Sequence, residues 1–163
     1  MSRTESDFSD FEKIYDTYAD MLYRISLAYT RNAANAEDIV HDVFIKFIES
    51  RCRFGSEEHR KAWFIRVTVN KCRDFIRSSR YRNYMPLDKA EYKLQTDTFS
   101  GTDTALAIEK LPYKYKAVVI LHYLEGYTVN EISGMLRISA SAVKMRLSRG
   151  RGILKDIAEE ESL

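Results

Sequence analysis

Residues 128–155 read TVNEISGMLRISASAVKMRLSRGRGILK and contain the clearest structural signal in the chain. Thr128 and Glu131 have the spacing of a capping box, which predicts the start of a short helix ending near Leu136. Residues 137–139 can form a tight turn, after which helical periodicity resumes. The stretch therefore predicts two short helices joined by a short turn, a helix-turn-helix.

The second of these helices is predicted to have one buried and one basic face. Either Ser139 or Ser141 can cap it. Its apolar positions recur at spacings of four, three and four, which defines the buried face. Residues 137–155 carry six positive charges and no negative charge. A basic, exposed helix after a short turn fits the major groove of DNA, with base contacts from its N-terminal half and phosphate contacts further on. The predicted buried positions are Val143, Leu147, Gly150 and Leu154.

A second basic helix is predicted upstream, from Trp63 to about Arg80. One side of it carries polar and cationic residues at spacings of four, three, four and three, which places them within an arc of about 80°. The opposite side carries residues suited to burial: Phe64, Thr68, Cys72 and Phe75. Two separate basic helices in one chain suggest a polyanion contacted at two places. The residues of this arginine stripe are Arg66, Asn70, Arg73, Arg77 and Arg80.

Charge is distributed unevenly along the chain of 163 residues, although its formal net charge is only +2. Residues 1–50 have a net charge of −5, whereas residues 51–82 have a net charge of +7. Two cysteines are too few for a disulfide framework and indicate a reducing cytosol. No metal-ligand spacing, phosphate loop or nucleophile–base pair is present, so we expect no cofactor and no enzyme activity. An acidic N-terminus and the lack of a long apolar run predict no signal peptide and no membrane insertion.

The organisation of the chain is predicted to be all-α, with two small helical domains. Aromatic and aliphatic residues from Phe11 to Tyr29 recur at helical spacing and predict a first long helix. We expect Asn35 to cap a second helix ending near Ile48, and residues 51–61 to form a polar loop. Residues 81–103 lack periodicity and read as a flexible linker, which separates a domain at 1–80 from one at 104–163. In the second domain, a helix near Pro112 should end before Gly126.

Several motifs resemble those of bacterial RNA polymerase sigma factors of the extracytoplasmic-function type, and the resemblance covers nearly the whole chain. Residues 36–44 (AEDIVHDVF) resemble the core-polymerase-binding helix, with His41 where Gln is usual. Ala62–Phe64, together with the following helix, resembles the region that reads the −10 promoter element. Residues 142–151 (AVKMRLSRGR) are similar to the −35 recognition helix. Arg137 stands where many members have a glycine in the turn.

The resemblance implies a promoter-specificity subunit that binds core polymerase, directs it to −10/−35 promoters and promotes DNA melting. Its partners would be the β′ clamp coiled coil and β flap of polymerase, double-stranded and melted promoter DNA, and an anti-sigma factor. The expected polymerase-binding residues are Asp38, His41, Asp42, Ile45 and Glu49. The expected −10 residues are Arg53, Phe54 and His59, from the region that would hold a flipped base, and the arginine stripe. The expected −35 residues are Ser141, Lys144, Met145, Ser148, Arg149 and Arg151.

Two other functions are compatible with the residues. A repressor or activator could use the helix-turn-helix without polymerase, but such proteins usually dimerise to match paired half-sites, and no extra apolar helix offers a dimer surface. A protein-interaction adapter would use neither basic surface on DNA. Promoter-dependent initiation by purified core polymerase separates both alternatives from the sigma factor.

Overall fold

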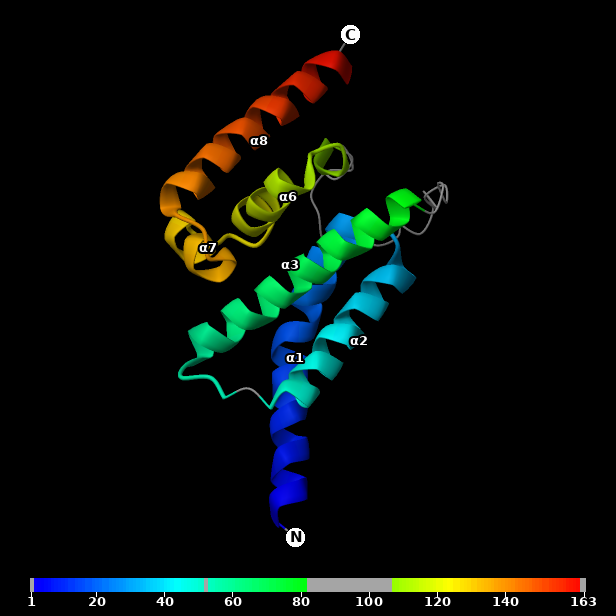
Figure 1. Cartoon of the computed structure of the whole chain (residues 1–163), viewed down its shortest axis with the longest axis vertical. Helices are drawn as coiled ribbons and strands as arrows, with labels where there is room; N and C mark the ends of the chain where they lie inside the picture. Colours follow the sequence, from blue (N-terminus) through cyan, green and yellow to red (C-terminus); the bar gives the residue numbers. More distant parts are fainter. Residues whose placement is uncertain (1, 52, 82–106, 162–163) are drawn as a thin grey trace.

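The computed structural model of the chain describes residues 2–51, 53–81 and 107–161. Every regular element in these ranges is a helix, which confirms the predicted all-α class. Their order is α1 (Ser2–Thr30), α2 (Ala33–Ser50), α3 (Glu57–Tyr81), α6 (Tyr113–Val119), the π-helix η2 (Ile120–Leu124), α7 (Val129–Leu136) and α8 (Ala140–Glu161). Figure 1 shows α1, α2 and α3 as long helices that pack on one another, with α1 passing behind α3, and α6, α7 and α8 grouped on one side of α3.

The first domain packs α1 against α2 and α3 through aliphatic and aromatic side chains. Leu22, Ile25, Val43 and Phe64 are fully buried between the three helices. The ring of Phe64 lies 4.9 Å from that of Tyr18, measured between centroids, in a stacked arrangement. Burial of large apolar side chains, each contributing roughly 1.5–3 kcal/mol, is what holds these helices together.

The start of α2 differs from the sequence prediction. Asn32, not Asn35, is the N-cap: its side-chain oxygen accepts a hydrogen bond of 3.0 Å from the backbone N–H of Asn35. The helix therefore starts at Ala33, and Ala36 and Val40 are buried within it. Both asparagines are good caps by residue type.

The start of α3 also differs, because the helix begins at Glu57 and not near Trp63. Ser56 accepts a hydrogen bond of 3.2 Å from the backbone N–H of His59, and its carbonyl accepts one of 3.1 Å from Arg60 N–H. Glu57 and Glu58 then occupy the first turn, where carboxylates interact favourably with the helix dipole. The prediction of a loop over residues 51–61 is therefore wrong for its second half.

The second domain confirms the predicted helix-turn-helix. Thr128 and Glu131 form the capping box of α7, with reciprocal hydrogen bonds of 3.2 and 3.3 Å between side chain and backbone. Ser139 caps α8 by accepting a hydrogen bond of 3.0 Å from Ala142 N–H, which decides between the two predicted serines. Gly126 ends the preceding helical segment with a φ of 77°, as its residue type suggested.

The core of the first domain continues into the second. Buried residues of α1 and α3 and buried residues of α6, η2, α7 and α8 belong to one continuous apolar cluster. Between the two domains, α7 contacts α3 and η2 contacts α1. The predicted linker lies outside the described residues except for Tyr81 at the end of α3.

Candidate nucleic-acid and protein interfaces

The arginine stripe lies on α3, opposite a face that is buried except at Phe75, which is half-buried. Phe64, Thr68 and Cys72 are each 0% exposed, as the spacing predicted. The Thr68 hydroxyl donates a hydrogen bond of 2.7 Å to the carbonyl of Phe64, so this buried polar group is satisfied within the helix. Of the stripe residues, Asn70 and Arg77 are exposed and two are half-buried; the side chain of Arg80 lies outside the described residues. The half-buried pair is Arg66 and Arg73.

Two stripe arginines contact the second domain. Arg66 Nη1 donates a hydrogen bond of 3.4 Å to the carbonyl of Met135, in the last turn of α7. Burial, together with the nearby charge of Arg137, lowers the pKa of Arg66. Arg77 Nη2 donates a hydrogen bond of 3.3 Å to the Tyr113 hydroxyl, and its guanidinium lies 5.6 Å from the centre of that ring. No local sequence pattern indicated that either arginine faces the other domain.

The region expected to hold a flipped base contains residues with different surroundings. Arg53 and His59 are exposed, and His59 lies in the first turn of α3 and not in a loop. Phe54 is half-buried, with its ring centre 6.2 Å from that of Phe47 and 5.8 Å from that of Trp63. Phe54 is therefore part of an aromatic cluster that ties this segment to α2 and α3.

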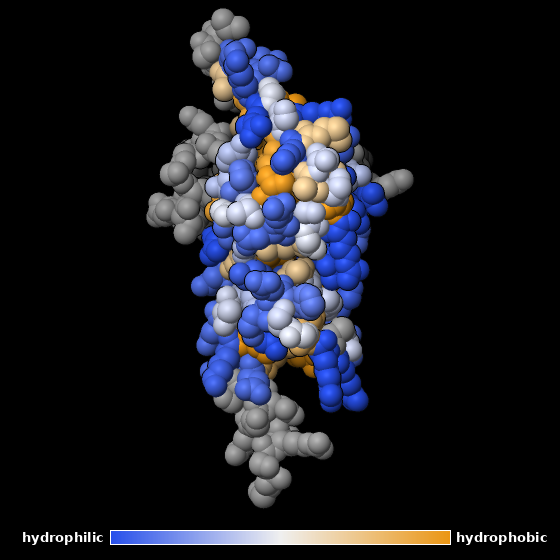
Figure 2. Space-filling view, turned by 90° about the vertical axis from the view of Figure 1, so that its left-hand side faces the viewer, coloured by the Kyte–Doolittle hydropathy of each residue, from blue (hydrophilic) through white to orange (hydrophobic). Residues whose placement is uncertain are grey.

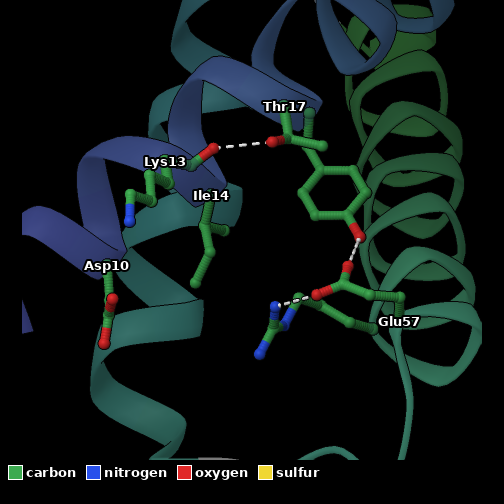
Figure 3. A pocket seen from close by; sticks show the side chains of 7 residues that line it. Asp10, Lys13, Ile14, Thr17 and Glu57 are labelled. Carbon is green, nitrogen blue, oxygen red and sulfur yellow. Dashed lines mark hydrogen bonds and ion pairs between the residues drawn. The ribbon is translucent and has the colours of Figure 1, made fainter.

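A pocket of about 350 Å³ lies beside this region, between α1 and the start of α3 (Figure 3). The Tyr18 hydroxyl donates a hydrogen bond of 2.7 Å to Glu57 Oε2, and burial followed by this carboxylate raises the pKa of Tyr18 to about 12. Asp10, Lys13 and Arg60 complete the charged lining. Two acidic and two basic side chains balance one another, so the pocket has no net preference for an anion.

The acidic face of α2 is exposed along its whole length. All five residues expected to bind polymerase are accessible on this helix, and Ile45 is 51% exposed. Two apolar neighbours were missed by the sequence reasoning: Ile48 is 57% exposed and Tyr15 of α1 is 37% exposed. Ile48 follows Ile45 by three residues, a spacing that could have placed both on one face. The five expected residues are Asp38, His41, Asp42, Ile45 and Glu49.

A groove of about 420 Å³ runs beside this face, between α2 and α3. Asp38 and Asp42 line it from α2, and Asp74 and Lys71 line it from α3. Three carboxylates against one ammonium make the groove acidic, which suits basic side chains of a protein partner.

The basic face of α8 is exposed, and Val143, Leu147 and Gly150 of its predicted apolar face are buried, whereas Leu154 is half-buried. Val143 and Leu147 are 0% and 3% exposed, whereas Met145 is 47% exposed. Arg151 Nη1 donates a hydrogen bond of 3.0 Å to the Tyr123 hydroxyl, so this arginine is held against the domain. Figure 2 views the molecule from the side where the α7–α8 turn lies in Figure 1, and shows a mostly hydrophilic surface with small hydrophobic patches. All six expected −35 residues are exposed: Ser141, Lys144, Met145, Ser148, Arg149 and Arg151.

Two other kinds of feature, a membrane-spanning helix and a metal site, are absent from the described residues. None of the helices in these ranges is long and apolar enough to cross a membrane. Within the same ranges, no group of three or more His, Cys, Asp or Glu side chains could hold a metal ion. Cys72 is buried, and burial raises the pKa of its thiol to about 12.

Two family models match the chain. Residues 14–82 match the family described as Sigma-70 region 2, and residues 103–154 match Sigma-70, region 4. The chain is 29% identical to the RNA polymerase sigma factor SigV of Bacillus subtilis (strain 168), over 86% of either chain. It is 27% identical to the ECF RNA polymerase sigma factor SigW of the same organism, over 93% of this chain and 90% of SigW.

Solved structures show the same fold. CnrH, in a complex with the cytosolic domain of CnrY, superimposes with a TM-score of 0.71 at 21% identity, covering 92% of this chain and 88% of CnrH. RpoE of Bartonella quintana, in a complex with the anti-sigma factor NepR, gives a TM-score of 0.67 at 18% identity, covering 92% and 97%. With both conserved sigma regions in order and relatives of matching length, the chain belongs to the RNA polymerase sigma factors of the extracytoplasmic-function type.

Proposed function

We propose that the three exposed surfaces divide the work of a sigma factor among α2, α3 and α8. In this division, residues 1–80 bind core polymerase and the −10 element, residues 104–163 bind the −35 element, and residues 81–103 connect them. The observation that carries the proposal is that each surface lies on a helix whose other face is buried, and that one is acidic and two are basic. Because the chain belongs to the sigma factors, we no longer propose that it acts as a repressor, an activator or an adapter.

The acidic face of α2 is proposed to dock on the β′ clamp coiled coil. Asp38, Asp42 and Glu49 would complement a basic helix, and Ile45 with the neighbouring Ile48 would supply apolar contact at the centre of the interface. Charge complementarity mainly raises the association rate and fixes orientation, whereas the apolar residues contribute most of the affinity. His41 is exposed on the same face. An exposed pair of isoleucines on an otherwise charged helix supports a protein partner.

The arginine stripe is proposed to lie against −10 DNA. Its arginines would contact phosphates, which position the protein without reading sequence. Asn70, the uncharged polar member, is exposed and can both donate and accept, so it is our candidate for base contact. Extrusion of a base costs a few kcal/mol and needs a receiving site. Arg53 and His59 are accessible for this role, whereas Phe54 is engaged by aromatic neighbours.

The exposed face of α8 is proposed to enter the major groove of the −35 element. Ser141, Lys144 and Met145 would approach base edges, since they lie in the first turns of the helix. Ser148, Arg149 and Arg151 lie further along and would contact the backbone. The β flap would bind this same domain. Family membership also leads us to expect an anti-sigma protein as a partner, and a cytoplasmic location where polymerase acts.

The experiment that tests the division compares two charge reversals in reconstituted holoenzyme. The double variant Arg73→Glu/Arg77→Glu should lower promoter opening, followed by permanganate footprinting, by at least tenfold while core binding stays near wild type. Asp38→Arg should weaken core binding, measured by titration with labelled core polymerase, and reduce opening only where the core is not saturated. The physical reason is that each reversal puts a repulsive charge into one interface only.

The contact of Arg77 with Tyr113 does not confound this test. Loss of that contact would free the stripe for DNA and so would increase opening, which is the opposite of the expected effect. Glu58→Arg, an exposed reversal at the start of α3, serves as the charge control. Equal losses of core binding and opening in both test variants, with circular dichroism unchanged, would refute the division of roles.

A further inference from the structure

A bidentate ion pair joins the two domains at a partly buried position. Arg24 of α1 donates hydrogen bonds from Nε and Nη2 to the two carboxylate oxygens of Glu125, at 3.0 and 2.9 Å. The side chain of Glu125 is only 6% exposed, whereas that of Arg24 is 36% exposed. The hydrogen bond to Glu125 raises the pKa of Arg24. A paired carboxylate with so little exposure depends on its partner, because alone it would be buried and uncompensated.

Further contacts surround this pair. Arg31, at the end of α1, forms an ion pair with Glu109, and its side chain is 6% exposed. The Tyr127 hydroxyl donates a hydrogen bond of 2.9 Å to Met21 Sδ, and the Lys61 ammonium lies 5.5 Å from the centre of the Tyr127 ring. These contacts join α1, the residue that follows it, and α3 to residues of the second domain on either side of α6 and η2. We call this set of contacts the latch.

The latch holds the second domain against the DNA-facing side of α3. Met135, whose carbonyl accepts from Arg66, lies in the last turn of α7, where unpaired carbonyls give the helix end a partial negative charge. The Tyr113 hydroxyl accepts from Arg77. These two acceptors occupy guanidinium groups that DNA phosphates would bind. The closed arrangement therefore places an internal acceptor where the promoter backbone would lie.

We propose that this chain inhibits its own promoter binding through the latch, which keeps the free protein closed until polymerase and DNA separate the domains. The inference rests on the proposed role of the arginine stripe. No partner protein is needed for the closed state, because every contact that maintains it comes from the chain itself. Arg24 and Glu125 carry no role in the proposed DNA or polymerase surfaces, so they regulate access to the stripe without belonging to it.

The test measures an interdomain distance in the full-length free protein. Spin labels are placed at Asp16→Cys on α1 and Ala158→Cys on α8, both exposed, in a Cys52→Ser background; the buried Cys72 remains unlabelled. We expect one narrow distance distribution in the reference protein. Arg24→Glu should broaden this distribution and shift its mean, because two carboxylates then face each other. The swap Arg24→Glu/Glu125→Arg should restore the narrow distribution, and Lys13→Glu, an exposed reversal on α1, should leave it unchanged.

A second readout links closure to DNA. The affinity of the free chain, without core polymerase, for a promoter fragment that carries the −10 element is measured by fluorescence anisotropy. This affinity should rise roughly tenfold in Arg24→Glu, because apparent affinity scales with the open fraction of the protein. In the swap variant, the affinity should return to the reference value. Reference and Arg24→Glu proteins with identical distance distributions would overturn the latch. Opening without a gain in affinity would overturn the inhibition. Neither result depends on the holoenzyme test of the stripe, so failure of the two proposals can be told apart.

Discussion

At the scale of single residues, Arg137 has a backbone conformation that its side chain disfavours. It ends α7 with a φ of 57°, and its N–H donates to the carbonyl of Ser133. Left-handed backbone costs a non-glycine residue about 1 kcal/mol. Burial lowers the pKa of the Arg66 guanidinium, and the charge of Arg137 lowers it further. Arginine at this position is therefore unfavourable for both backbone and charge.

Arg137→Gly should raise the free energy of unfolding by about 0.5–1 kcal/mol, because glycine adopts positive φ without strain. Urea denaturation followed by circular dichroism measures the change. Arg137→Ala is the matched control: it removes the charge but keeps the strained backbone, so it should give little of the gain. A glycine variant no more stable than the alanine variant would show that the turn is not strained.

Residue types alone could predict the kind of cap at each helix start but not always its position. Thr128 and Glu131 were placed correctly because a capping box requires two residues at one spacing. Asn32 and Asn35 each qualify as a cap by residue type, so residue type alone does not decide between them. Ser56 was missed because the charged residues that follow it resemble a loop, although Glu57 and Glu58 suit a first helical turn.

At the scale of elements, α8 packs closely on α6 through a glycine. A Cβ added at Gly150 would lie 2.9 Å from Val119 Cγ2, whereas one added at Gly152 would meet nothing within 4 Å. Gly150→Ala should lower the free energy of unfolding by about 1–2 kcal/mol, because overpacking outweighs the gain in helix propensity. Gly152→Ala should raise it by up to about 1 kcal/mol. Thermal denaturation of both variants measures this difference in stability. A stabilising Gly150→Ala would mean that α6 and α8 can move apart at little cost in free energy.

Periodicity predicted which face of each helix is buried, but not which helices meet. The buried positions of α3 and α8 follow directly from apolar spacing. The hydrogen bond from Arg66 to Met135 spans 69 positions in sequence, and the pair of Arg24 with Glu125 spans 101. No local pattern specifies such partners, because either arginine is equally suited to solvent or to DNA by type alone.

At the scale of the whole molecule, a buried thiol and buried tyrosine hydroxyls make the folded state less stable at alkaline pH. The pKa of Cys72 is raised from 9.0 to about 12 by burial, and that of Tyr18 from 10.0 to about 12 by burial and Glu57. Burial also raises the pKa of Tyr29. Each group keeps its proton in the folded state at pH values where the unfolded chain loses it. Their contribution is complete below pH 9 and declines as pH rises toward 12.

The free energy of unfolding should therefore fall above pH 9 by up to about 1.4 kcal/mol per pH unit for each such group. Urea midpoints at a series of pH values measure the slope. Cys72→Ala should lower stability at neutral pH and make the alkaline decline shallower, since one titrating group is removed. A decline of the same steepness in this variant would mean that the thiol ionises normally in the folded protein.

The π-helix η2 makes the docking of the two domains depend on the exact number of residues in this segment. Winding Ile120–Leu124 with hydrogen bonds such as Glu125 N–H to Ile120 carbonyl, at 3.1 Å, accommodates one residue more than an α-helical turn would. One residue corresponds to a rotation of about 100° in an α-helix. Deleting a residue there would turn Glu125 and Tyr127 away from α1 while leaving both intact. In evolutionary terms, a single-codon gap could abolish the docking of the two halves without replacing any residue that makes the contact.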